Sequence, residues 1–108
     1  MVDVQYHAHI KEMPKDERPR ERLEFYGAQA LSNAELLAIA LRTGTKRENV
    51  IGLSQRLLTT FEGLGGLSRA SVQELCGVPG IGRAKAVQIK AAMELGKRVM
   101  FMPDGDRI

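Results

Sequence analysis

Tryptophan is absent from this 108-residue sequence, aromatic residues make up 5% of it, and it has one cysteine, Cys76. Because alternating runs of β-branched residues are also few, Leu, Ile, Val and Ala must form most of the core, which favours helices over a sheet. A single cysteine excludes an internal disulfide bond and fits a reducing compartment, so we expect a cytoplasmic protein. We interpret Cys76 itself as a small core residue.

Long apolar runs and a signal segment are absent too. No apolar stretch approaches the ~18 residues of a membrane-spanning helix, and the N-terminus lacks the charged, apolar and small-residue regions of a secretion signal. The sequence also shows no paired acid and base, no activated nucleophile and no P-loop. We therefore expect no membrane contact, no cofactor and no catalysis by this chain.

Metal-ligating residues are sparse. His7 and His9 lie close together, but no third ligand follows at a suitable spacing, so we expect no metal site. Residues 1–9 have no helical period and are expected to form a flexible tail. Pro103-Asp104-Gly105 marks residues 100–108 as a linker or tail.

The net charge of +3 is too small to identify a partner. Its distribution is uneven, with −2 over residues 1–41, +3 over residues 42–70 and +2 over residues 71–108. A basic excess in the last two thirds fits a nucleic-acid partner, but a solvated surface of mixed charge explains it equally well.

Start and stop signals divide the chain into about five short helices. Capping boxes at Ser32–Glu35 and Ser71–Glu74 mark two helix starts. Gly44 is expected to end the first of these helices, and the glycines at 63–66 to end the helix that follows it. The predicted helices span residues 19–26, 33–42, 49–61, 71–76 and 83–99, with a single turn at 67–70.

The chain resembles itself at an offset of fifty residues. Glu24, Gly27, Ala34 and Ile39 recur as Glu74, Gly77, Ala84 and Ile89. Both copies consist of a short helix, a turn that starts with glycine and a longer helix. We interpret them as two helix-hairpin-helix units, at 19–42 and 71–99, related by a pseudo-twofold axis and joined by the helix at 49–61.

In the predicted all-α domain of residues 10–99, each unit is expected to bury the apolar face of the other. The last helix presents Ala84, Val87, Ala91 and Leu95 on one face, with Ile89 and Met93 alongside.

The second turn, Gly77-Val78-Pro79-Gly80-Ile81-Gly82, has the composition of a phosphate-binding hairpin. Its glycines tolerate unusual backbone angles, and Ile81 is expected to plug into the core. The missing Cβ atoms of Gly80 and Gly82 leave main-chain N–H groups open to an anion at the start of a long helix. A plain glycine-rich turn between helices is the alternative interpretation.

We predict a phosphate-binding site in this second unit. Additional basic contacts are predicted just after the second helix, where a solvated loop is the alternative. The first unit is expected to be structural, because Ala30 and Ser32 replace the inner glycines and the Ser32 hydroxyl can cap its own helix. The predicted DNA-phosphate ligands are Gly80, Ile81, Gly82, Arg83 and Lys85, and the additional cations are Arg42, Lys46 and Arg47.

Four ordered motifs resemble the N-terminal region of bacterial RadC-like DNA repair proteins (UPF0758). They are Asp16–Leu23, Ala30–Ala38, Leu41–Thr45 and Pro79–Ala86, and the resemblance extends over about residues 10–99. It implies a tandem helix-hairpin-helix domain similar to the second domain of RuvA. In that family the region precedes a JAB/MPN-type domain with a zinc-hydrolase-like motif.

This chain ends at Ile108, before any such motif, so no metal or peptidase residue of the family maps onto it. A fragment cut near Pro103 and a short natural form both fit.

Two functions remain open at this stage. The first is an accessory domain that binds the DNA sugar-phosphate backbone without sequence preference, beside a hydrolase domain or a repair partner. The second is a protein-docking module that positions a separate JAB/MPN-type domain. The docking function predicts an exposed apolar patch that includes Leu64, Leu67, Val99 and Phe101.

Overall fold

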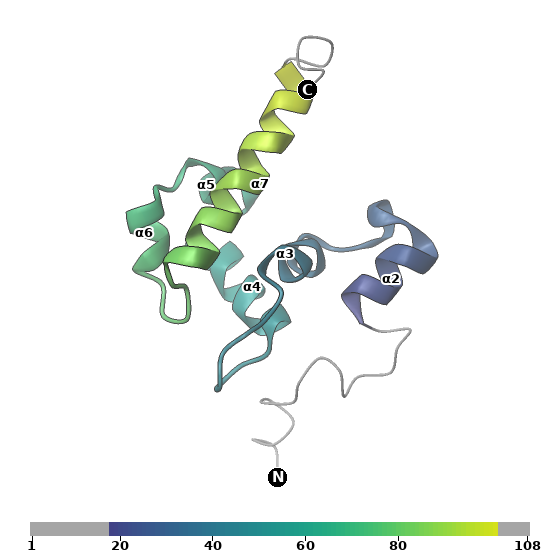
Figure 1. Ribbon diagram of the computed structural model, residues 1–108, viewed down its shortest axis with the longest axis horizontal. Helices are drawn as coiled ribbons and strands as arrows, with labels where there is room; N and C mark the ends of the chain where they lie inside the picture. Colours follow the sequence, from purple (N-terminus) through teal and green to yellow (C-terminus); the bar gives the residue numbers. More distant parts are fainter. Residues whose placement is uncertain (1–17, 102–108) are drawn as a thin grey trace.

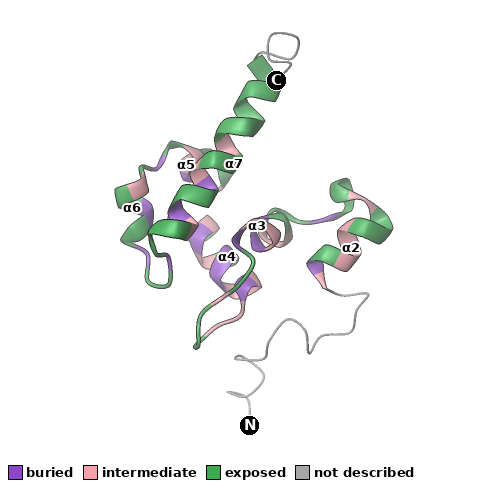
Figure 2. Ribbon diagram, viewed as in Figure 1, coloured by how far each residue is buried: buried purple, intermediate pink, exposed green. Residues whose placement is uncertain are grey.

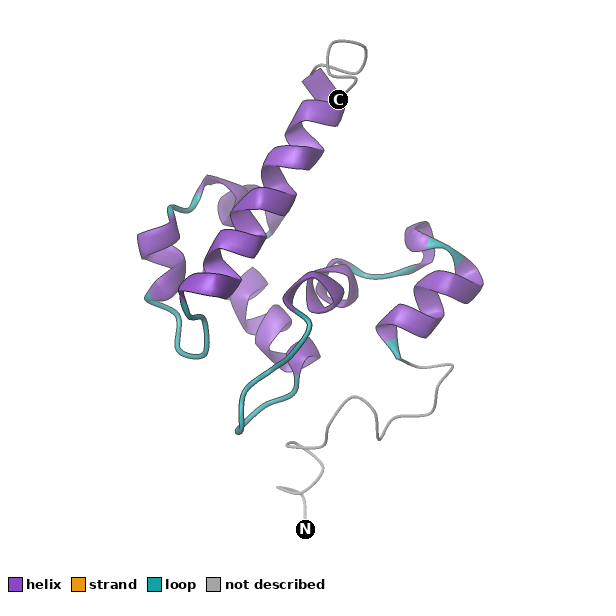
Figure 3. Cartoon of the chain, in the orientation of Figure 1, coloured by secondary structure: helices purple, strands orange, loops and turns teal. Residues whose placement is uncertain are grey.

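Six α-helices and one turn of 3₁₀ helix make up residues 18–101, the part of the chain that the computed structural model describes, and this part contains no strand (Figure 3). The predicted all-α fold class is confirmed. The predicted tail at 1–9, with His7 and His9, lies outside the described residues. In chain order the elements are α2 (Pro19–Tyr26), η3 (Ala28–Ala30), α3 (Asn33–Leu41), α4 (Val50–Thr60), α5 (Leu64–Arg69), α6 (Val72–Cys76) and α7 (Arg83–Phe101).

Local sequence signals set most of the helix starts. Both predicted capping boxes are present: the Ser32 hydroxyl accepts from the Glu35 backbone N–H at 3.1 Å, and Ser71 accepts from Glu74 at 3.0 Å. In each box the glutamate carboxylate accepts the backbone N–H of the serine in return. The Asn49 side chain caps α4 in a similar way. These caps satisfy N–H groups that a helix start otherwise leaves unpaired.

Glu35 also joins α2 to α3, because its carboxylate lies 2.9 Å from the Arg22 guanidinium. The backbone hydrogen bond from Ser32 is the main cause that lowers the pKa of Glu35, and Arg22 acts in the same direction. A carboxylate whose pKa is lowered by folding stabilises the folded state above its unfolded pKa, and this stabilisation is lost as the pH falls.

We therefore expect the stability difference between the wild type and Glu35→Gln to be largest near pH 7 and to shrink as the pH falls below about 4. Thermal denaturation across this pH range measures the difference. Glu24→Gln, at an exposed position on α2, is the control and should show no such pH dependence. A pH-independent cost for Glu35→Gln would contradict the prediction.

The core lies where α3, α4, α5 and α6 meet the first half of α7 (Figure 2). Four leucines, Leu53, Leu57, Leu67 and Leu75, are completely buried. Ile81, the expected plug of the second turn, and Leu31, after the first turn, are also buried. The packing of α3 on α7 brings together the longer helices of the two predicted units. Each unit has the expected order of short helix, turn and longer helix, while the pseudo-twofold relation stays a prediction.

The apolar face expected for α7 is wrong. Its buried residues are Ala86 and Ile89, whereas Val87 is 51% exposed and Leu95 66% exposed. Only the first half of α7 crosses the other helices, and the second half projects beyond them as far as Phe101 (Figure 1). Residues 100 and 101 are therefore helical, and the expected linker could begin only after them.

Three further expectations are corrected. Helix α4 ends at Thr60, and Gly63, with φ +106°, separates it from α5, so the break expected at the glycines is present; however, α5 begins at Leu64 and includes Gly65 and Gly66, where only a single turn at 67–70 was expected. Gly66 is needed within α5, since a Cβ there would lie 1.7 Å from the Phe61 carbonyl oxygen. Helix α3 ends at Leu41, before Gly44 is reached. Cys76 is exposed and not part of the core.

Candidate nucleic-acid interface

The hairpin between α6 and α7 is fixed to the core by its apolar residues. Val78 and Ile81 are buried, and Ile81 donates its N–H to the Val78 carbonyl oxygen at 3.0 Å. Gly80 has a φ of +94°, which strongly favours glycine. A Cβ at Gly80 would lie 2.9 Å from the Thr45 methyl carbon, so the missing side chain of Gly80 leaves room for Thr45.

Gly82 immediately precedes α7 and is exposed to solvent. A Cβ added there would meet nothing within 4 Å, and its carbonyl oxygen accepts from the Ala86 N–H, as the residue before a helix does. The backbone N–H groups of Gly82, Arg83, Ala84 and Lys85 donate to no other residue among 18–101. Three other helices have side-chain caps at this position, whereas Gly82 has no side chain to provide one.

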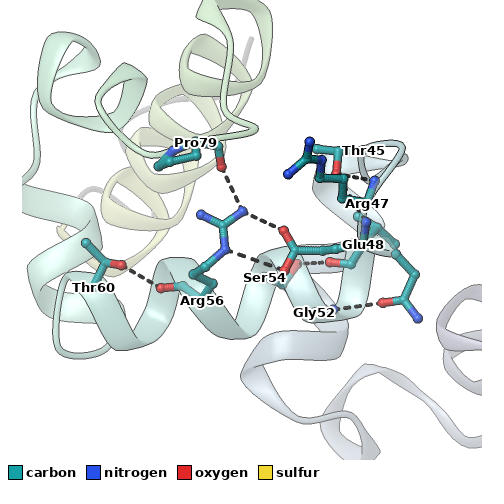
Figure 4. Close-up of polar contacts among 10 residues, drawn as sticks. Thr45, Arg47, Glu48, Gly52, Ser54, Arg56, Thr60 and Pro79 are labelled. Carbon is teal, nitrogen blue, oxygen red and sulfur yellow. Dashed lines mark hydrogen bonds and ion pairs between the residues drawn. The ribbon is translucent and has the colours of Figure 1, made fainter. Parts of the chain in front are cut away.

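The loop between α3 and α4, residues 42–49, is compact and internally bonded. Arg42 has φ +73° and ψ −51°, and the Thr43 N–H donates to the Leu41 carbonyl oxygen at 2.9 Å, which defines a γ-turn. The Thr45 hydroxyl accepts the N–H groups of Arg47 and Glu48 (Figure 4). This left-handed residue at Arg42, and not Gly44, redirects the chain after α3.

Arg56 joins this loop to the hairpin. Its guanidinium pairs with Glu48, and the same group donates to the Pro79 carbonyl oxygen at 2.7 Å (Figure 4). Glu48 raises the already high pKa of Arg56. Sequence reasoning missed Arg56, because its partners lie 8 and 23 residues away and no local pattern connects them.

Lys85 is a tether rather than a free cation. Its ammonium donates to the Leu41 carbonyl oxygen and to the Thr43 hydroxyl, each at 3.0 Å, and so ties the start of α7 to the end of α3. Burial lowers the pKa of Lys85, and the nearby Arg42 lowers it further. We predicted Lys85 as a phosphate ligand, but its ammonium already has two partners.

Four cations near the hairpin have exposed side chains with no partner among residues 18–101. They are Arg42, Lys46, Arg47 and Arg83. The loop and the hairpin descend on the same side of the molecule (Figure 1), and Arg56, Lys85 and Gly80 bring them into contact. The structure thus groups the predicted site residues at 80–83 with the additional basic residues at 42–47.

The described residues offer little support for other kinds of site. No three His, Cys, Asp or Glu side chains within residues 18–101 are placed to hold a metal ion. Every helix in this range is too short or too polar to cross a membrane.

Comparison with known proteins assigns the family. A UPF0758 protein of Bacillus licheniformis is 60% identical over 98 residues, which cover 91% of this chain and 44% of that protein. UPF0758 proteins of Caldanaerobacter subterraneus subsp. tengcongensis and Clostridium botulinum are 54% and 53% identical, over 90% and 91% of this chain and 42% and 43% of their own lengths. The chain therefore spans less than half the length of these relatives.

No solved structure matches the chain. The family model described as UPF0758 N-terminal matches residues 10–87, and this chain belongs to the UPF0758 family.

Proposed function

We propose that this domain binds the sugar-phosphate backbone of DNA without reading its sequence. The observation that carries the proposal is the uncapped start of α7, where four N–H groups have no acceptor among residues 18–101 and the side chain of Arg83 is exposed. Helix N-termini bind phosphates because their N–H groups are unpaired and the helix dipole is positive there. Backbone N–H and guanidinium groups contact phosphates of any sequence.

The same domain would act within a longer protein. The relatives are more than twice as long as the segment they share with this chain. We infer that the domain places the remainder of such a protein, a JAB/MPN-type hydrolase domain according to the family resemblance, next to DNA. One hairpin provides few phosphate contacts, so weak binding is expected for the isolated domain, as suits an accessory role.

Fluorescence anisotropy with a labelled duplex of arbitrary sequence tests the proposal. We expect binding at low salt that weakens steeply as salt rises, with a slope of log K against log[salt] of about −0.9 for each phosphate contacted. Duplexes of unrelated sequence should give the same affinity. An absence of binding at low salt would overturn the proposal.

A second candidate function, protein docking, is favoured by the apolar residues on the second half of α7. Val99 and Phe101 are 71% and 74% exposed, and Leu95 and Met100 are exposed to a similar degree. Exposed apolar side chains grouped on one helical segment are typical of a binding surface. Of the patch that we predicted, Leu64 is partly exposed but Leu67 is completely buried. Docking as the sole function predicts no salt-dependent affinity for DNA.

A further inference from the structure

The hairpin at 77–82 and the loop at 42–49 form one structural unit. Arg56 contacts both of them, through Glu48 on one side and the Pro79 carbonyl oxygen on the other (Figure 4). The Thr45 methyl group packs where Gly80 has no side chain. These contacts tie the backbone of the loop to the backbone of the hairpin.

The loop directs its positive charge outward. Glu48, the acidic residue of the segment 42–49, is turned inward against Arg56, and this leaves the side chains of Arg42, Lys46 and Arg47 exposed and unpaired among the described residues. Three cations and no exposed free carboxylate thus face solvent from eight residues.

Arg42 is held in an unfavourable position. Its left-handed turn is rare for a residue with a Cβ. Lys85 braces this turn by bonding to the residues on either side of Arg42, Leu41 and Thr43. The brace brings a second positive charge close to Arg42, and their repulsion is one reason why the pKa of Lys85 is lowered. Strained residues and neighbouring like charges are concentrated at binding sites, where a ligand of opposite charge relieves the repulsion.

We propose that the loop at 42–49 is a second phosphate-binding element, and that it and the hairpin hold neighbouring phosphates of the same DNA strand. This inference rests on the proposed function and extends it. The two elements are in direct contact at Thr45 and Gly80, whereas the grooves that separate opposite strands are about 6 and 12 Å wide. Arg42 and Arg47 are the principal cations of the second element.

The test compares two double variants in the salt titration. Arg42→Gln with Arg47→Gln removes two charges from the loop, and Arg69→Gln with Lys97→Gln removes two exposed charges from α5 and from the second half of α7. We expect the loop variant to reduce the steepness of the salt slope on duplex DNA by about 1.8 and to weaken binding at least about tenfold at low salt. The control variant should keep the wild-type slope.

Single-stranded DNA tests whether one strand is held. On single-stranded DNA, the slope of log K against log[salt] should be less steep for the loop variant than for the wild type, by about 1.4 for two contacts. If the wild type binds duplex DNA but the loop and control variants have equal slopes of log K against log[salt], the loop is not a phosphate-binding element. That result would leave the proposed function intact. If the loop variant has a shallower salt slope than the wild type on duplex DNA but not on single-stranded DNA, the loop reaches the opposite strand. That result would overturn the one-strand arrangement. Circular dichroism confirms that each variant retains its helices.

Discussion

An aspartate at position 82 is expected to raise the stability of the domain and to remove most of its affinity for DNA. Gly82 precedes α7, and a side chain there meets nothing within 4 Å. A carboxylate at this position would accept the N–H groups at the start of α7 and interact favourably with the helix dipole, which stabilises the fold by roughly 0.5–1 kcal/mol. The same N–H groups would then be unavailable to a phosphate, which the added negative charge would also repel.

The expected loss of affinity for Gly82→Asp is about 30- to 100-fold at low salt. Hydrogen bonds to charged groups contribute about 1.5–3 kcal/mol, and about 1.4 kcal/mol corresponds to a factor of ten. Anisotropy measures the affinity and thermal denaturation measures the stability. Because the two are expected to change in opposite directions, misfolding could not account for the result.

Two matched variants separate the effect of capping the N–H groups from the effect of the added negative charge. Gly82→Ser provides a neutral cap and reproduces the arrangement at Ser32, which precedes α3 as Gly82 precedes α7 and caps that helix. Gly82→Ala adds a methyl group without a hydrogen-bond acceptor. Affinity should decrease in the order Gly, Ala, Ser, Asp. Wild-type affinity in Gly82→Asp would contradict a phosphate site at the start of α7.

The features of this site that the sequence predicts are local ones. Ser32 and Ser71 cap helices through bonds to residues three positions away, so each signal is contained in four letters. Ile81 lies between two glycines, and a plug in the turn follows from that pattern. The position of Gly82 before a helix is also local, because a long helical period begins at the next residue.

The features that the sequence does not predict depend on contacts between distant segments. Lys85 bonds to residues 44 and 42 positions away, and no spacing rule distinguishes such a tether from an exposed cation. Gly80 has the same composition signal as Gly82, but only the position of Thr45 shows that its missing side chain serves packing. Charged residues in a hairpin can thus be identified from sequence, whereas their division into structural and exposed groups cannot.

Helix α7 shows a related limit. Apolar residues occupy two sides of it, because Val87 and Ile89 are two positions apart and therefore about 200° apart around the helix axis. Periodicity identifies both sides as apolar but not which of them meets α3 and α6. The structure buries Ile89 to 1% exposure and leaves Val87 about half exposed.

Truncation of these two side chains should therefore have very different effects. Ile89→Ala removes buried methyl and methylene groups from the contact between α7 and the core, and similar substitutions cost about 2–5 kcal/mol. For a domain of this size that cost lowers the melting temperature by about 10 °C or more. Val87→Ala removes half-exposed atoms, and alanine is the better helix former, so a change within about 0.5 kcal/mol is expected.

Thermal and urea denaturation of the two variants measure this difference, and the urea midpoint shows whether the transition remains cooperative. Comparable destabilisation by both substitutions would mean that α7 is rotated from the orientation described, with its predicted face of Val87 and Leu95 against the core. That result would also move Ala86 and the first turn of α7. The proposed phosphate site is linked to the orientation of α7 through Arg83, because the side on which Ile89 is buried also sets the side of the helix from which the Arg83 side chain projects, whereas the N–H groups at 82–85 point along the helix axis.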